Sequence, residues 1–257
     1  MAGHWTPLPD GMAFVSIPAT HGLDTWERAR RELADNWVVL LHARLVDWLP
    51  EQIDDAALRV LLGQGWCRYL EMVRGGLGAR TVATRALLRH AAANLVEEDG
   101  ELLELSYGPT GRPYLSGCQW LDISLSYVDD LVLLGVTTRG LIGVDVERLD
   151  RDLYRTGQSG RICSPYELVT LAGIAEEERN RDLVRLCTLK GAYGSAMGVP
   201  FCPSEIGFGP DGRAVRVCRP DGTPADGDEW TFRSFVLDDE YLVGAAVYDA
   251  DRESCRP

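Results

Sequence analysis

Residues Trp120–Asp150 read WLDISLSYVDDLVLLGVTTRGLIGVDVERLD, and the other segments of the chain can be interpreted around them. The stretch contains two apolar runs typical of strands and closes with two carboxylates one residue apart, Asp145 and Glu147. Alternate side chains of a strand share a face, so a strand over Leu141–Glu147 would project both carboxylates together while the intervening valines enter the core. Two neighbouring carboxylates suit Mg²⁺ bound to a phosphate. The alternative is a solvated strand end that carries two acids.

The composition is that of an ordinary soluble globular protein, with 46% apolar and 25% charged residues in a chain of 257. This length suits one large domain or two small ones. The formal net charge of −13 argues against nonspecific binding to nucleic acid or to an anionic membrane, because both need excess Lys and Arg. An anionic ligand would therefore need a local basic pocket.

Cysteine spacing and the N-terminal residues indicate a reducing, cytoplasmic setting. The seven cysteines form no C-x-x-C pair, which favours free thiols over a disulfide framework or a zinc site. No apolar run is long enough to span a bilayer. Residues 1–14 lack the basic and apolar regions of a signal peptide, so we expect a cytoplasmic protein without a membrane partner.

The order of helix and strand signals predicts an α+β fold with two similar halves, residues 1–140 and 141–257. Arg85 and Arg89 lie four residues apart and share one face of a predicted helix. That face is either a solvated basic stripe or a pair that faces a phosphate. Periodicity predicts helices over residues 24–35, 79–96 and 176–197, and strands over 38–45, 141–147, 230–236 and 241–247.

Helix starts and ends have recognisable signals at three places. Ser164-Pro165-Tyr166-Glu167 is a strong helix start, with Ser164 as N-cap, proline in the first turn and Glu167 closing a capping box. Asp24 and Glu27 have the same capping-box spacing and predict the start of an earlier helix. Gly198 is expected to end the helix over 176–197.

Five short segments stand in order along residues 84–198: TRALLR at 84–89, GRPYL at 111–115, DISLS at 122–126, GVDVE at 143–147 and CTLKGAYGSAMG at 187–198. Residues 231–247 add a predicted strand pair with DDEY at its turn. In this order and spacing the segments resemble the motifs of the Sfp-type 4′-phosphopantetheinyl transferases. The resemblance covers about residues 80–248.

The resemblance implies two pseudo-twofold-related α+β halves with the active-site cleft, and coenzyme A, between them. Such enzymes move the phosphopantetheine arm from coenzyme A to a serine of an acyl or peptidyl carrier protein, and they use Mg²⁺ on the diphosphate. By position, Asp145 and Glu147 match the metal ligands, and Lys190 and Glu147 are the expected catalytic residues. The residues expected to bind coenzyme A are Arg85, Arg112, Ser124, Ser126 and Lys190.

The chain departs from the family pattern at several positions of the expected cleft. Gly191 stands where the family has the glutamate that is its third metal ligand and favoured general base, and Ser195 replaces a second lysine. Leu125 replaces a histidine that contacts coenzyme A, and Asp122 replaces an asparagine. Loss of a general base alone lowers a rate by about 10²–10⁴, so efficient transfer is not expected.

Two hypotheses follow. The favoured one is a divergent member repurposed in a natural-product pathway for polyketides or peptides, whose cleft holds a small hydrophobic intermediate and catalyses a cyclisation or isomerisation, with weak or no transfer. A non-catalytic binding partner of a carrier protein is a variant of it. The other is a working Mg²⁺-dependent phosphopantetheinyl transferase. Mg²⁺ and coenzyme A are expected cofactors only in the second case.

Overall fold

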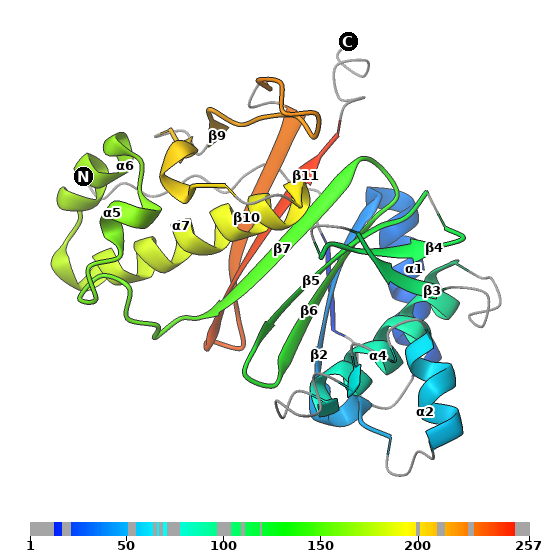
Figure 1. Ribbon diagram of the computed structural model, residues 1–257. Coiled ribbons are helices and arrows are strands. Elements are labelled where there is room, and N and C mark those ends of the chain that lie inside the picture. Colours follow the sequence, from blue (N-terminus) through cyan, green and yellow to red (C-terminus); the bar gives the residue numbers. More distant parts are fainter. Residues whose placement is uncertain are drawn as a thin grey trace. The chain divides into compact units, whose positions relative to one another are not determined.

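The protein has a mixed α+β fold, as the sequence predicts (Figure 1). A computed structural model describes residues 13–16, 22–50, 55–63, 66, 69–70, 78–96, 104–108, 111–118, 120–198, 201–209, 214–225 and 229–249. The chain divides into two compact units, unit 1 with residues 1–11, 124–128 and 139–257, and unit 2 with residues 12–123 and 129–138. Each unit is therefore discontinuous in sequence. The division into halves at residue 140 and the pseudo-twofold relation stay predictions.

Unit 2 combines helices with a mixed sheet. Strand β1 pairs in parallel with β2, which pairs antiparallel with β6, and β3 pairs antiparallel with β4 in a separate two-stranded sheet. Strand β5 is shared, its first two residues in unit 2 and the rest in unit 1. The elements are β1 (Ala13–Ser16), α1 (Leu23–Asn36), β2 (Val38–Arg44), η1 (Leu45–Trp48), α2 (Asp55–Leu62), α4 (Gly78–Val96), β3 (Glu104–Tyr107), β4 (Pro113–Ser116), β5 (Asp122–Val128) and β6 (Leu131–Thr137).

The core of unit 2 forms where α1 and α4 pack together and α1 covers β2. Apolar residues of β2 and β6 are almost completely buried, which is why both strands read as continuous apolar runs rather than alternating ones. The ring of His90 on α4 lies 5.0 Å from that of Trp26 and 5.2 Å from that of Trp48. His90 is thus part of this packing.

Unit 1 is built on one three-stranded antiparallel sheet in the order β10-β11-β7, with one long helix, α7, lying on it (Figure 1). Shorter elements surround the helix. The elements of unit 1 after β5 are β7 (Leu141–Arg148), α5 (Ser159–Ile162), α6 (Pro165–Ala172), α7 (Glu176–Met197), η3 (Pro203–Glu205), β8 (Gly207–Phe208), β9 (Ala214–Val215), β10 (Trp230–Leu237) and β11 (Tyr241–Tyr248).

Glycines let α7 approach the sheet until backbones meet. A Cβ atom added to Gly143 on β7 would lie 1.9 Å from the carbonyl oxygen of Ala192, and one added to Gly244 on β11 would lie 2.6 Å from the carbonyl of Thr188. Residues 143 and 145 share a face of β7 because they are two apart. Asp145 therefore faces α7.

Most predicted element boundaries are confirmed to within a few residues, and one expected helix cap is wrong. The capping box at Ser164 and Glu167 is present, and α7 spans the predicted residues and ends at Gly198 with a φ of 64°. Helix α1 is present, but its N-cap is Gly22 and no side chain caps it, so Asp24 does not form the predicted box. The N-terminal residues were expected to be irregular or extended, and residues 13–16 are extended in β1, whose pairing with β2 is a long-range contact that local sequence does not encode.

Two observations bear on the expected cellular setting. Among the described residues no helix is both long and apolar enough to cross a membrane. Thiols are free at the cysteines within the described residues, namely Cys118, Cys163, Cys187, Cys202 and Cys218. Residues 1–12 of the segment that was interpreted as lacking a signal peptide lie outside the described residues, and the cytoplasmic location stays a prediction.

Candidate functional site

The two carboxylates of the GVDVE segment lie side by side on β7, as strand alternation predicts. Val144 and Val146 are buried, whereas Asp145 and Glu147 are half-buried and share the face that α7 covers. Register with β11 places Asp145 opposite Gly244. The small neighbour leaves room for the carboxylate beneath the helix.

The two serines of the DISLS segment are hydrogen-bonded to β7. The hydroxyl oxygen of Ser124 accepts the backbone N–H of Val144 at 3.1 Å, and that of Ser126 accepts the N–H of Val146 at 3.2 Å. Ser126 in turn donates its own proton to Oδ1 of Asp145 at 2.9 Å. Both serines thus hydrogen-bond to the backbone of β7. Their predicted role in coenzyme A binding stays a prediction.

Gly191 on α7 lies directly against Asp145. A Cβ atom added to Gly191 would lie 2.2 Å from Oδ2 of Asp145 and 2.8 Å from its Cγ. These distances are far below van der Waals contact, so no residue with a side chain fits here unless Asp145 moves. The position that holds a glutamate in the resembling family is therefore filled, in this protein, by the Asp145 carboxylate.

Burial dominates the electrostatics of the carboxylate pair. It raises the pKa of Asp145 from 3.8 to about 7, against the lowering effect of the Ser126 hydrogen bond and with a further raise from the Glu147 charge. Burial also raises the pKa of Glu147, and the charge of Arg151 opposes this shift. Cys187 on α7 experiences the same surroundings, since burial and then the charges of Glu147 and Asp145 raise its pKa to about 11.

Arg151 forms an ion pair with Glu147. It lies four residues beyond Glu147, in the loop after β7, and its Nη1 contacts Oε1 of the carboxylate. The guanidinium is half-exposed, while 19% of the Glu147 side chain is exposed, so the pair sits at the rim of the site rather than in the core. The carboxylate pair therefore already has one cation bound to it.

Lys190 is fully buried and makes three hydrogen bonds. Its ammonium group donates to Oε2 of Glu167 at 2.6 Å and to the carbonyl oxygens of Ile162 and Ile206 at 2.7 and 2.9 Å. An ammonium group has three protons, and all three are engaged. Burial lowers the pKa of Lys190, and the Glu167 carboxylate counteracts that shift.

Glu167 combines the predicted helix cap with the pairing of Lys190. Its Oε2 also accepts the N–H of Ser164 at 2.7 Å, and its Oε1 accepts the N–H of Phe208 at 2.9 Å. The Lys190–Glu167 pair thus joins α5, α6 and β8 to α7. The predicted catalytic and coenzyme A roles of Lys190 stay predictions, and in this geometry the ammonium group serves the fold.

The predicted cations of unit 2 also have partners within the protein. Arg112 forms an ion pair with Asp122, so the aspartate that replaces the family asparagine is neutralised by the arginine expected to bind coenzyme A. Arg85 is buried, donates to the carbonyl of Leu105 at 2.5 Å and lies over the ring of Tyr107 at 5.4 Å. Arg85 is thus not part of a solvated stripe.

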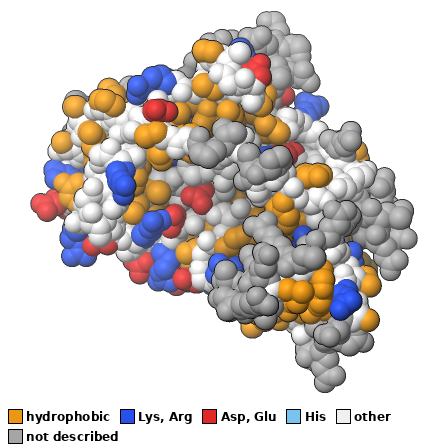
Figure 2. Space-filling model, in the orientation of Figure 1, with side chains coloured by type: hydrophobic (Ala, Val, Ile, Leu, Met, Phe, Trp, Pro, Cys, Tyr) orange, Lys and Arg blue, Asp and Glu red, His pale blue; other side chains and the backbone are white. Residues whose placement is uncertain are grey.

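Two other departures from the family pattern, Leu125 and Ser195, are half-buried in unit 1. Neither introduces a titratable group. On the face drawn in Figure 2, basic side chains lie scattered among acidic ones rather than in one broad basic area. A protein with a formal net charge of −13 is expected to lack such a broad basic area on this face.

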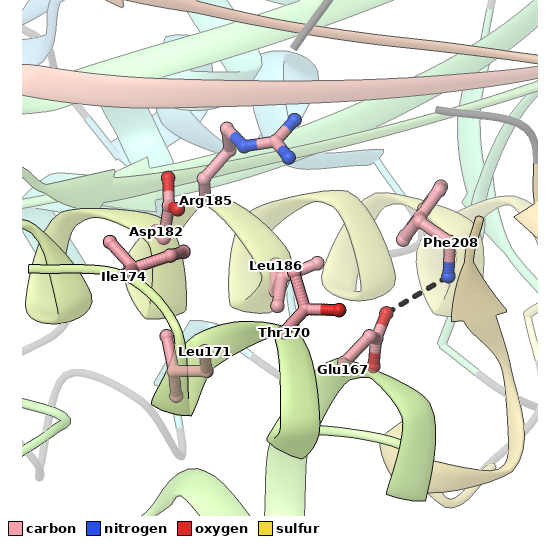
Figure 3. Close-up of a pocket in the computed structure, with 8 residues that line it drawn as sticks. All are labelled: Glu167, Thr170, Leu171, Ile174, Asp182, Arg185, Leu186 and Phe208. Atoms are coloured by element: carbon pink, nitrogen blue, oxygen red, sulfur yellow. Dashed lines mark hydrogen bonds between the residues drawn. The ribbon is translucent and has the colours of Figure 1, made fainter. Parts of the chain in front are cut away.

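A small pocket lies between α6 and α7 (Figure 3). Its cavity volume is about 10 Å³, which is near the lower limit for one water molecule. A hydrophobic biosynthetic intermediate would not fit there without rearrangement. Its lining comprises Glu167, Thr170, Leu171, Ile174, Asp182, Arg185, Leu186 and Phe208.

The described residues do not bring a full set of Mg²⁺ ligands together. Gly191 supplies no third carboxylate, and Arg151 holds Glu147. Within the part of the chain that the structure describes, no group of three or more His, Cys, Asp or Glu side chains is arranged to hold a metal ion. The three cations expected on coenzyme A each contact protein oxygen atoms: Arg85, Arg112 and Lys190.

Sequence reasoning missed the partners rather than the motif residues. Arg151 was overlooked because a spacing of four brings side chains together on a helix, whereas Glu147 lies on a strand and Arg151 in the loop after it. Glu167 was interpreted as a cap alone. Lys190 is the single lysine of the sequence and stands among apolar residues of α7, and that pattern could have indicated a buried ammonium group that needs a buried carboxylate.

Comparison with known proteins supports a distant relationship. The chain matches no family model. It is 28% identical over 123 residues to a protein of Synechocystis sp. that is named provisionally as a 4′-phosphopantetheinyl transferase. The match covers 46% of this chain and 49% of that protein, so the chain spans about half the length of the curated relative it matches. The similarity indicates a phosphopantetheinyl-transferase-like protein, which agrees with the motif resemblance.

Proposed function

We propose that this phosphopantetheinyl-transferase-like protein transfers the phosphopantetheine arm weakly or not at all, and that it acts instead on a hydrophobic intermediate of a carrier-protein-dependent biosynthetic pathway. The observation that carries the proposal is the contact between Gly191 and Asp145. The place of the family's general base and third metal ligand holds no side chain, and the Asp145 carboxylate occupies the space where one would begin.

The state of the predicted coenzyme A ligands supports the same conclusion. A phosphate of coenzyme A would compete with Asp122 for Arg112 and with Glu167 for Lys190. Breaking the buried Lys190–Glu167 pair costs about 3–5 kcal/mol. Leu125, in place of the family histidine, and Ser195, in place of a lysine, remove two further cationic groups. The inherited site is thereby less suited to an anionic ligand and more suited to an apolar one.

The test is a transfer assay on the intact protein. The protein is incubated with Mg²⁺, coenzyme A and a panel of apo acyl and peptidyl carrier proteins, and each carrier is followed by intact-mass spectrometry. We expect less than about one per cent of the rate of a working transferase run on the same carriers, because loss of a general base lowers rates by about 10²–10⁴. Full conversion of any carrier at a comparable rate would overturn the proposal.

A binding measurement separates the versions of the proposal. Calorimetry with coenzyme A should show weak binding, and binding of a carrier loaded with a hydrophobic acyl chain should be tighter than binding of the apo carrier. Equal binding of loaded and apo carriers, without any modification, would instead identify a non-catalytic carrier-protein partner.

A second candidate function is Mg²⁺-dependent phosphopantetheinyl transfer. The observation that favours it is the adjacency of Asp145 and Glu147 on one face of β7. Conversion of a carrier in the assay above, abolished by Asp145→Ala, would support this candidate.

A further inference from the structure

Arg151 is held in place by its backbone as well as by its ion pair with Glu147. Its N–H donates to the carbonyl of Arg148 at 3.1 Å, and its own carbonyl accepts from Nδ2 of Asn180 on α7 at 2.9 Å. Oδ1 of Asn180 accepts the N–H groups of Leu153 and Tyr154 at 2.9 and 3.0 Å. One asparagine of the helix thus fastens the loop after β7, so that Arg151 starts from a defined position beside Glu147.

The neighbouring arginines of this loop are paired elsewhere. Arg148 contacts Asp150 and Glu240, and it lies over the ring of Tyr241. Arg155 pairs with Asp152 and is strongly exposed. Within the described loop, Arg151 is therefore the arginine placed on the carboxylate pair.

We propose that Arg151 is the built-in counter-ion of the Asp145–Glu147 pair and occupies the charge position that a divalent cation would otherwise take. A guanidinium and a metal ion compete for the same oxygens of Glu147, and two cations a few ångströms apart repel each other strongly in partly buried surroundings. The protein as it stands should bind divalent cations poorly at this pair, and removal of the guanidinium charge should create affinity. This inference concerns the cation at the pair and goes beyond the proposed function.

The experiment measures Mn²⁺ alone, by electron paramagnetic resonance of the free ion and by calorimetry, on the metal-free full chain. Arg151→Gln keeps most of the side-chain length and removes the charge, and Arg151→Ala removes both. We expect both variants to bind one Mn²⁺ at least about tenfold more tightly than the unchanged protein, since removal of one nearby charge in partly buried surroundings is worth this much or more.

Arg155→Gln is the matched control, because it removes an arginine of the same loop that pairs with Asp152 instead. Its affinity for Mn²⁺ should equal that of the unchanged protein. The double variant Asp145→Asn with Arg151→Gln should lose the gained site. Circular dichroism and urea unfolding confirm that each variant is folded, and if the alanine variant is not, the glutamine variant decides.

Two results would overturn the proposal. One is an unchanged Mn²⁺ affinity in folded Arg151→Gln, and the other is a gain that persists after Asp145→Asn, because the ion would then bind elsewhere. Neither result depends on the transfer assay. A protein that transfers the arm but shows the expected Mn²⁺ ranking would contradict the proposed function and leave the counter-ion role of Arg151 standing.

Discussion

Gly191 is the residue at which the sequence departs most from the resembling family, and its surroundings explain why it is glycine. A helix interior disfavours glycine by about 1 kcal/mol relative to alanine. The structure offsets this cost through the close approach of α7 to β7, in which the Asp145 carboxylate takes the space of a Cβ atom. The missing glutamate and the half-buried aspartate are thus two parts of one local arrangement.

Replacement of Gly191 by alanine should therefore destabilise the protein although it favours the helix. The new methyl group displaces the Asp145 carboxylate and its hydrogen bond from Ser126, a charge-assisted bond worth about 1.5–3 kcal/mol. After the gain in helix propensity of about 1 kcal/mol, we expect a net loss of about 0.5–2 kcal/mol in the free energy of unfolding. Urea unfolding followed by circular dichroism measures it.

Two comparison variants show whether Asp145 is the cause. Gly160→Ala in α5, where no atom lies within 4 Å of the new Cβ, should be neutral or stabilising. In an Asp145→Ala background the loss caused by Gly191→Ala should disappear, so the double-mutant cycle should give a coupling energy of about 1 kcal/mol or more. Additive effects of the two substitutions would show that the contact does not exist in solution.

At the scale of elements, local signals determine where α7 begins and ends, and long-range contacts determine where it lies. Its bounds follow from helix periodicity and from the C-terminal Gly198, whose positive φ suits glycine. Its placement depends on contacts that are distant in sequence, above all the buried Lys190, which reaches the end of α5, the start of α6 and the residue before β8. One side chain thus connects three short elements that could not be stable alone.

Disruption of this connection should loosen α5 and α6 before the whole unit unfolds. Lys190→Met leaves Glu167 buried without its cation and should cost about 3–5 kcal/mol. Glu167→Gln keeps the shape of the side chain and removes its charge, so it should speed the opening of the contacts between Lys190 and α5, α6 and the residue before β8. Because Lys190 is the single lysine of the chain, an amine-reactive ester followed by peptide mass spectrometry reports its exposure directly.

In the folded protein we expect Lys190 to react orders of magnitude more slowly than a free lysine, and faster in Glu167→Gln. Glu177→Gln, which removes an exposed carboxylate at the start of α7, should change neither rate nor stability by much. Rapid modification of Lys190 in the unchanged protein would contradict the buried Lys190–Glu167 ion pair.

At the scale of the whole molecule, stability should fall at alkaline pH. Burial, and then the charge of Glu167, raises the pKa of the Cys163 thiol from 9.0 to about 11, while the nearby Lys190 charge lowers it. The folded state therefore keeps a proton that the unfolded state releases between about pH 9 and pH 11. Stabilisation from this thiol is complete below pH 9 and is lost as the pH rises through 11, by on the order of 2 kcal/mol.

The measurement compares urea midpoints at pH 8 and pH 10.5 for the unchanged protein and for Cys163→Ala. Groups that titrate in both proteins cancel in this comparison, so the smaller pH dependence of the variant isolates Cys163. Cys202→Ser, which changes an exposed thiol, should behave like the unchanged protein. An equal loss in Cys163→Ala would show that the thiol is not responsible.

Much of the fold was predictable because its signals are local. Strand alternation placed Asp145 and Glu147 on one face of β7, and capping chemistry placed the start of α6. Strand β1 escaped prediction because it forms by pairing with β2. The candidate site was predictable in part: the motif positions followed from spacing and resemblance, whereas the ion pairs of Arg151, Arg112 and Lys190 each join residues whose approach local sequence does not specify.

Local sequence thus suffices for most elements, the adjacent carboxylates and the phosphopantetheinyl-transferase-like character, because periodicity, caps and motif spacing act over a few residues. The charge state and occupancy of the candidate site follow from packing instead. Desolvation under α7 raises the pKa of Asp145, the approach of two backbones excludes a side chain at Gly191, and chain folding brings the guanidinium of Arg151 to Glu147. Energies of this kind depend on distance in space and on burial, which a linear sequence does not display.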